Sequence, residues 1–97
     1  MPTYIMLGQW TDHGIRHVKD SPARLNAARD LCRQHGAEIE TFYMTMGPYD
    51  MVIVIDAPND EAFAKLVISI AKGGNIRSTS LKAFDEEQYR KIIESVG

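Results

Sequence analysis

Tyr49 and Asp50 are the first candidates for chemistry, because they follow Gly47-Pro48 directly before the most apolar run in the chain. A phenol can donate a hydrogen bond to a ligand, and a neighbouring carboxylate can orient that ligand or accept a proton. His17, in a polar segment after the first apolar stretch, could share this acid–base work. The alternative is structural, since these residue types also form tight reversals in which the Asp carboxylate accepts backbone amides. The sequence leaves both interpretations open.

Histidine and cysteine give weaker signals. His13 and His17 stand four residues apart, a spacing that would align two imidazoles on one face of a helix. Only Asp12 lies close by, whereas a closed metal site needs three or four ligands. We therefore expect solvent-exposed histidines, no bound metal and no other cofactor. Cys32 falls on the apolar side of a helical pattern without a partner for nucleophilic catalysis, which predicts a small buried residue.

An apolar ligand pocket is the other kind of site that the sequence suggests. Methionine and aromatic side chains gather on segments with strand character, and methionine fills adaptable pockets. Either Arg24 or Arg77 could pair with a ligand carboxylate in a bidentate fork, or form a weak surface ion pair. The serines of the last such segment would suit a pocket wall or a half-solvated edge strand equally well. The predicted ligand-binding residues are Met6, Trp10, Tyr43, Arg77, Ser78 and Ser80.

Four strands and three helices would position these residues. A Ser21-Pro22 pair predicts the first helix start, with the Ser21 hydroxyl as its cap. Apolar residues at a helical period predict the second helix over 59–72, and Asp85 with Gln88 resembles a capping box that opens the third. Segments rich in strand formers predict the strands, which cover residues 3–10, 37–46, 50–57 and 75–84.

The order β-α-β-β-α-β plus a terminal helix is that of a ferredoxin-like α+β fold with an antiparallel four-stranded sheet. Right-handed crossovers put both main helices on one side of this sheet, so the other side should be polar. It is not, because Ile5 and Leu7 alternate with Tyr4 and Met6, and the third strand is apolar on both faces as well. An exposed apolar face of that size is unusual in a monomer. We therefore predict a homodimer that packs sheet on sheet, with the terminal helix at the rim.

Length, charge and cysteine content limit the class of protein. The 97 residues predict a single domain over 1–97, and the net charge of -2 lacks the basic face that a nucleic acid or an anionic membrane requires. The apolar runs are far shorter than the ~20 residues of a membrane helix. The N-terminus has no signal-peptide pattern, and the single cysteine fits a reducing compartment. These features favour a cytoplasmic protein.

Three segments together resemble the GYD domain family: YIMLGQWTDHGIRHVKDSPAR near the start, MGPYDMVIVIDAPNDEA in the middle and GGNIRSTSLKAF near the end. The resemblance implies a ferredoxin-like subunit that pairs into a dimeric α+β barrel, and it supplies no catalytic residues.

Three functions are compatible with these observations. The first is a homodimeric binding or sensing module for a small, mostly apolar ligand. The second is a cofactor-independent enzyme, similar to monooxygenases or isomerases, that uses Tyr49, Asp50 and His17. The third is a purely structural role for the dimer.

Overall fold

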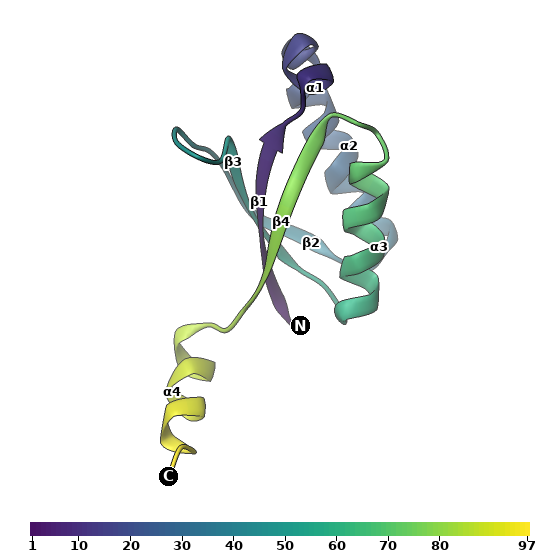
Figure 1. Cartoon of the computed structure of the whole chain (residues 1–97). Coiled ribbons are helices and arrows are strands. Elements are labelled where there is room, and N and C mark those ends of the chain that lie inside the picture. Colours follow the sequence, from purple (N-terminus) through teal and green to yellow (C-terminus); the bar gives the residue numbers. More distant parts are fainter.

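The four predicted strands pair into one antiparallel sheet with the order β2-β3-β1-β4 (Figure 1). The structure, a computed structural model, describes residues 1–97. The ferredoxin-like α+β fold predicted from the sequence is confirmed. Helices α2 (Ser21–Gln34) and α3 (Asp60–Ala71) both lie on the same side of the sheet, as right-handed crossovers require. The strands are β1 (Thr3–Trp10), β2 (Glu38–Met44), β3 (Met51–Asp56) and β4 (Ile76–Ala83).

The segment between β1 and α2 is more helical than predicted. It contains a short helix α1 (Asp12–Arg16) and a 3-10 turn η1 (Val18–Asp20). The prediction that Ser21 caps α2 was wrong, because η1 runs directly into α2 and Ser21 already has helical dihedral angles. Asp20 is the N-cap residue, and no side chain caps this helix. Side chains do cap the two later helices: at α3 the Asn59 side chain accepts from the Ala62 amide, and the last helix has the predicted capping box.

The last helix, α4 (Glu86–Glu94), opens with the predicted capping box between Asp85 and Gln88. It extends beyond the end of β4, away from the sheet and the other helices (Figure 1). Two i,i+4 ion pairs on its surface, formed by Arg90 with Glu86 and by Lys91 with Glu87, support the helix locally. α4 therefore lacks the tertiary packing that stabilises the other helices, and an isolated helix of this length is only marginally stable in water.

The hydrophobic core lies between the sheet and the two main helices. Met6 of β1, Ile55 of β3 and Leu66 of α3 are almost completely buried there. The Tyr4 and Phe63 rings stack with their centroids 4.1 Å apart, which joins β1 to α3. Cys32 is fully buried in the same core, as predicted, and burial raises the pKa of its thiol. No helix of the chain has the length and apolarity needed to cross a bilayer.

Candidate functional site

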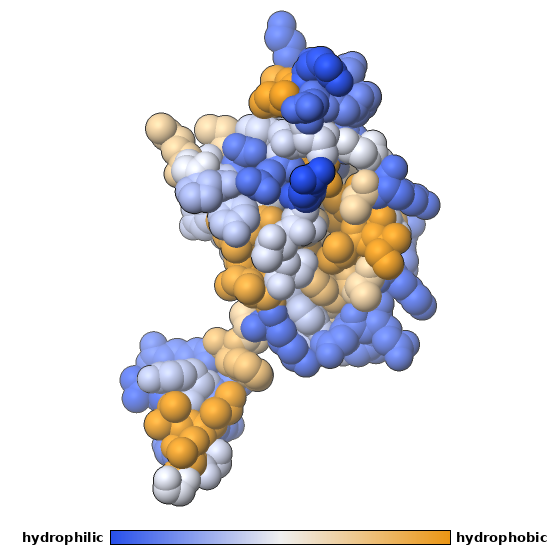
Figure 2. All heavy atoms as spheres, in the orientation of Figure 1, coloured by the Kyte–Doolittle hydropathy of each residue, from blue (hydrophilic) through white to orange (hydrophobic).

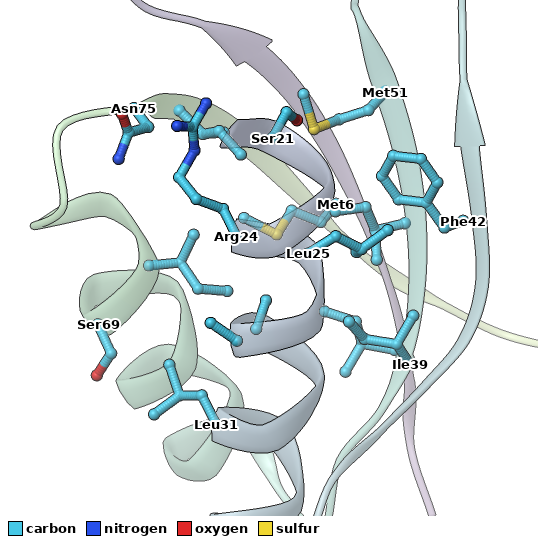
Figure 3. Close-up of a pocket in the computed structure, with 16 residues that line it drawn as sticks. Met6, Ser21, Arg24, Leu25, Leu31, Ile39, Phe42, Met51, Ser69 and Asn75 are labelled. Carbon is cyan, nitrogen blue, oxygen red and sulfur yellow. The ribbon is translucent and has the colours of Figure 1, made fainter. Parts of the chain in front are cut away.

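An apolar cavity of about 200 Å³ lies between α2, α3 and the covered face of the sheet (Figure 3). The helices contribute Leu25, Ala28 and Leu31 of α2 and Ile70 of α3. Twelve of the 16 lining residues are hydrophobic, and the sheet supplies its part from three adjacent strands and the start of the fourth. The strand residues that line the cavity are Met6, Ile39, Phe42, Met51, Ile53, Ile55 and Ile76.

Arg24 is the only charged residue that lines this cavity. Its side chain extends toward the Asn75 end of the cavity in Figure 3. Nη1 donates to the backbone carbonyl of His17 at 3.1 Å, and Nη2 donates to that of Gly14 at 3.4 Å. The Nε atom is buried and has no hydrogen-bond partner. One end of an otherwise apolar cavity therefore carries a fixed positive charge with an unused donor.

Gly14 holds the segment to which Arg24 is bound close to the start of β4. A Cβ atom at this position would lie 2.0 Å from the backbone oxygen of Asn75, a separation that no side chain can adopt. The same oxygen accepts from the Thr11 amide at 3.0 Å, and the Thr11 side chain caps α1 by accepting from the Gly14 amide. The glycine between the two histidines is therefore required by a close backbone approach.

A second pocket is a polar cleft on the surface, at the β1–α1 junction. It is lined by ten polar, glycine or proline residues and by Trp10, whose buried Nε1 has no hydrogen-bond partner. Asp50 and Arg77 lie in this cleft with His13 and Arg16. The Asp50 carboxylate accepts a hydrogen bond from the Trp10 amide at 2.9 Å, and the Asp50 amide donates to the Gly8 carbonyl at 2.8 Å. Asp50 thus extends the pairing of β1 with β3, the structural role that its place in the turn allowed.

The structure does not gather Tyr49, Asp50 and His17 into one pocket. Asp50 alone lines one of the two main pockets. The backbone carbonyl of Tyr49 accepts from the Thr45 hydroxyl at 2.7 Å, which closes the β2–β3 turn. His17 is the exposed C-cap residue of α1, and its ring lies 4.5 Å from that of His13. An acid–base role shared by these three residues stays a prediction.

The predicted ligand-binding residues are distributed over three places. Met6 lines the apolar cavity, whereas Trp10 and Arg77 line the polar cleft. Tyr43 is 63% exposed on the face of the sheet that no helix covers. Ser78 and Ser80, on the helix side of edge strand β4, line neither of the two main pockets.

The cavity residues that the sequence analysis missed are mostly helix-face positions. Leu25, Ala28 and Leu31 recur at helical spacing, a pattern that indicates the buried face of a helix and does not distinguish a cavity wall from a filled core. Arg24 was considered as a carboxylate partner, but Arg77 was the arginine placed among the predicted ligand-binding residues. The available signal for Arg24 was its position directly before Leu25, the first apolar residue of the helical pattern. The burial of Arg24 depends on how closely α1 approaches Asn75 at the start of β4, and no local sequence pattern encodes that approach.

The uncovered face of the sheet is apolar along its middle, as the sequence predicted. Ile5 pairs with Val54 and Leu81, and Leu7 pairs with Val52, which places all five side chains on this face. Leu81 remains 47% exposed, and no element of the chain covers the patch. We name these five residues, together with Tyr43, the open-face patch.

Charges flank the open-face patch at both ends of the strands. Glu38 and Asp56 pair across β2 and β3 at one end, and Arg77 of β4 lies at the other end. Glu40 of β2 lies beside Asp56, and a hydrogen bond to Asp56 together with the negative charge of that carboxylate raises the pKa of Glu40. The face therefore has an acidic end, an apolar middle and a basic end.

The apolar side chains of α4 form a second uncovered surface. Tyr89, Ile92 and Ile93 of α4, together with Val96 just beyond its end, are between 43% and 67% exposed, and Phe84 precedes them in the connection from β4. In Figure 2, hydrophobic side chains gather on the projecting helix, apart from the body of the molecule. We name Tyr89, Ile92, Ile93 and Val96 the α4 stripe. The stripe makes the helix strongly amphipathic, and no other element of the chain covers it.

Fold and cavity define the chain as a small α+β domain of the ferredoxin-like type with an apolar interior cavity. The sequence assigns it to a family as well: it belongs to the GYD domain family, whose model matches residues 4–93. A relative from Thermus thermophilus, named "Glutamine synthetase and cystathionine beta-lyase binding protein", is 31% identical over 84 residues, which cover 86% of this chain and 88% of the relative. The resemblance inferred from the three sequence segments is confirmed.

Solved structures with the same fold include regulatory proteins. A feast or famine regulatory protein from Mycobacterium tuberculosis, complexed with L-methionine, matches with a TM-score of 0.67 at 20% identity over 88% of this chain. The chain spans about half of that protein, with 51% covered. A second structure, of a protein from Thermus thermophilus, matches with a TM-score of 0.57 at 21% identity, over 88% of this chain and 95% of that one. At these identities the matches establish the fold alone.

Proposed function

We propose that this protein is a homodimeric binding module that holds a small, mostly apolar ligand between its helices and its sheet. The observation that carries the proposal is the cavity of about 200 Å³, with 12 hydrophobic residues among the 16 that line it. Apolar walls with a few convergent polar groups are typical of small-molecule sites. Ser21, Arg24, Ser69 and Asn75 are the polar residues among those that line this cavity.

The size of the cavity limits the ligand. Clefts for drug-sized molecules usually measure about 300–1,000 Å³, so this cavity suits a smaller compound. A well-packed core leaves few voids larger than a water molecule, and an unfilled apolar cavity costs stability in proportion to its volume. A ligand that fills this space would therefore stabilise the fold in addition to being recognised by it.

Pairing of two chains through their open-face patches supports the dimeric part of the proposal. The patch joins half-buried residues of central strands β1 and β3 with exposed residues of both edge strands. Contiguous apolar surface of this kind marks an interaction site. A second copy is the occupant that the charges favour. If the two-fold axis runs perpendicular to the strands, the acidic end of each face meets the Arg77 end of the other.

The same axis would give α4 a partner. The helix leaves the sheet at the Thr3 end of β1, where Thr3 pairs with Ala83. Because this axis places the acidic end of one sheet on the Arg77 end of the other, α4 approaches the Arg77 end of the partner's sheet. At that end the β2–β3 turn exposes Met44 and Met46. Met46 is 96% exposed, so this turn provides apolar surface that the α4 stripe can cover. Both surfaces left uncovered in one chain are thus matched in a two-fold pair.

Native mass spectrometry of the purified protein, compared with its denatured mass, tests the proposal directly. The expected result is a dimer that carries additional non-covalent mass. In Ala28→Phe, the larger side chain enters the cavity, so the dimer should persist and the additional mass should be lost. A monomer at micromolar concentration would contradict the pairing. A dimer that neither carries extra mass nor gains thermal stability from any small apolar compound would contradict the ligand site.

Docking on a larger protein is a second candidate function, favoured by two observations. The Thermus thermophilus relative is named as a binding protein for two enzymes. The α4 stripe of this chain is also an amphipathic surface of the kind that lies in an apolar groove of a partner. Titration of purified glutamine synthetase and cystathionine beta-lyase with the protein tests this role. Loss of binding in the double variant Ile92→Lys/Ile93→Lys, provided that this variant remains dimeric, would support the docking role. Absence of binding of the wild-type protein to either enzyme would contradict it.

A further inference from the structure

We propose that the ligand of the apolar cavity carries a carboxylate, and that Arg24 binds it. This inference rests on the proposed ligand-binding function and names the class of ligand: a small aliphatic or aromatic carboxylic acid in its ionised form. Two properties of Arg24 carry it, namely an unused hydrogen-bonding edge and a charge without an ion pair.

The guanidinium group is held in place by backbone contacts that leave one edge free. A guanidinium has five N–H donors in a fixed planar arrangement. Nη1 and Nη2 each donate to one carbonyl of the α1 segment, those of His17 and Gly14. Nε is buried and without a partner. Three donors remain, and two of them, the Nε–H and the second N–H of Nη2, together form an edge that can bind a carboxylate through two parallel hydrogen bonds.

Arg24 forms no ion pair with a carboxylate of the chain. None of the five ion pairs in the structure includes Arg24. The lining residues include no aspartate or glutamate. A charge partly removed from water is costly unless it is paired and hydrogen-bonded. An incoming carboxylate would provide both the missing charge and the acceptor for Nε, which a neutral ligand could not do.

The rest of the cavity determines what lies behind the carboxylate. Arg24 reaches the Asn75 end of the cavity, whereas Leu31 and Ser69 lie toward the other end (Figure 3). Between them the wall is formed by aliphatic side chains of α2 and by the sheet. An acid that places its carboxylate on Arg24 therefore directs its hydrocarbon part along α2. Affinity should rise about fourfold for each added CH2 until the cavity is full.

Calorimetric titration with hexanoate and with hexanamide separates this inference from the proposed function. The two probes have nearly the same shape, but only hexanoate is charged. We expect the wild-type protein to bind hexanoate at least tenfold more tightly than hexanamide at pH 7.5. Arg24→Met should reduce hexanoate binding to the level of hexanamide and leave hexanamide binding unchanged. Arg33→Met, on the exposed side of the same helix, serves as the matched control and should change neither affinity.

Each outcome leads to a separate conclusion. Equal affinity of the wild-type protein for both probes would overturn the assignment of the carboxylate and leave the apolar site intact. Binding of neither probe, up to millimolar concentration, would overturn the proposed ligand site itself. Arg24 also holds the α1 segment, so Arg24→Met could distort the cavity, and loss of hexanamide binding would reveal this. In that case the ratio of hexanoate to hexanamide affinity in the wild-type protein tests the carboxylate assignment. Arg24→Lys, which keeps the charge but not the planar edge, should show a smaller ratio.

Discussion

The two faces of the sheet are both apolar, but only one of them is completed by its own chain. On the helix side, Met6 and Ile55 are 1% exposed, and α3 contributes Leu66, which has no exposed surface. On the other side, Ile5, Leu7, Val52 and Val54 are only half-buried, and Leu81 is almost half exposed. The same strands supply both sets of residues by simple alternation. Burial in this molecule is thus decided by what lies over a face and not by the composition of the face.

This difference separates two kinds of function. The covered face, with its helices, forms a cavity with an interior and a charged end, which suits a small molecule. The open face is broad and has charges at its two ends, which suits a flat partner such as a second sheet. We expect substitutions on the covered face to act on folding and ligand binding, and those on the open face to act on association.

Removal of packing from the covered face should have the largest effect. Leu66→Ala deletes a fully buried side chain from the core and should lower the free energy of unfolding by about 2–5 kcal/mol. Urea denaturation followed by circular dichroism measures this loss. Ala64→Ser, on the exposed side of the same helix, is the control and should change stability by less than ~0.5 kcal/mol. A loss below about 1 kcal/mol in Leu66→Ala would mean that the helix is not firmly packed on the sheet.

A charge on the open face should act mainly on pairing. Leu7→Lys puts an ammonium group in the middle of the open-face patch, where a second sheet would have to desolvate it. We expect the dimer dissociation constant to increase at least tenfold, or about 1.4 kcal/mol, in sedimentation equilibrium. Gln34→Lys, at the exposed end of α2, should leave it unchanged. An unaltered dimer in Leu7→Lys would show that the copies pair through another surface.

A smaller and pH-dependent effect is expected at the edge of the covered face. Tyr4 donates a hydrogen bond to Asp60, which also forms an ion pair with Lys82 at 3.1 Å. Burial, together with the hydrogen bond to Asp60, raises the pKa of Tyr4 from 10.0 to about 12, whereas the hydrogen bond from Tyr4 and that from Lys82 lower the pKa of Asp60. The raised pKa of Tyr4 provides stability that is complete below about pH 10 and lost as pH rises toward 12. The lowered pKa of Asp60 provides stability above its ordinary value of 3.8 that is lost below it.

Tyr4→Phe tests this pH dependence. The variant keeps the ring that stacks on Phe63 but removes the phenol, so its stability should decline less than that of the wild type between pH 10 and 12. It should also decline less below pH 4, because Asp60 would retain only Lys82. Chemical denaturation at pH 3, 7 and 11 measures both limbs. Identical pH profiles of the two proteins would mean that the Tyr4–Asp60 contact does not persist in solution.

Local patterns predicted the elements well, whereas the grouping of the candidate site residues in space depends on contacts that local patterns do not specify. The limits of β1 at Thr3 and Trp10, the capping box at Asp85 and the burial of Cys32 all follow from residues close together in the chain. The Ser21 cap failed, because the preceding 3-10 turn changes the direction from which the chain enters α2. The role of Asp50 depended on the Trp10 amide, 40 residues away, which no turn pattern specifies.

The sequence by itself determined the order of the elements, the two apolar faces of the sheet and the membership of the GYD domain family. Each of these depends on the type and spacing of neighbouring residues, which carry their information locally. Only the tertiary structure decided which arginine lies in a cavity. Arg24 and Arg77 look alike in the sequence, but the close approach of Gly14 to Asn75 brings carbonyl groups onto one guanidinium and leaves its Nε buried. A contact between segments about 60 residues apart distinguishes them, and such contacts exist only in the folded chain.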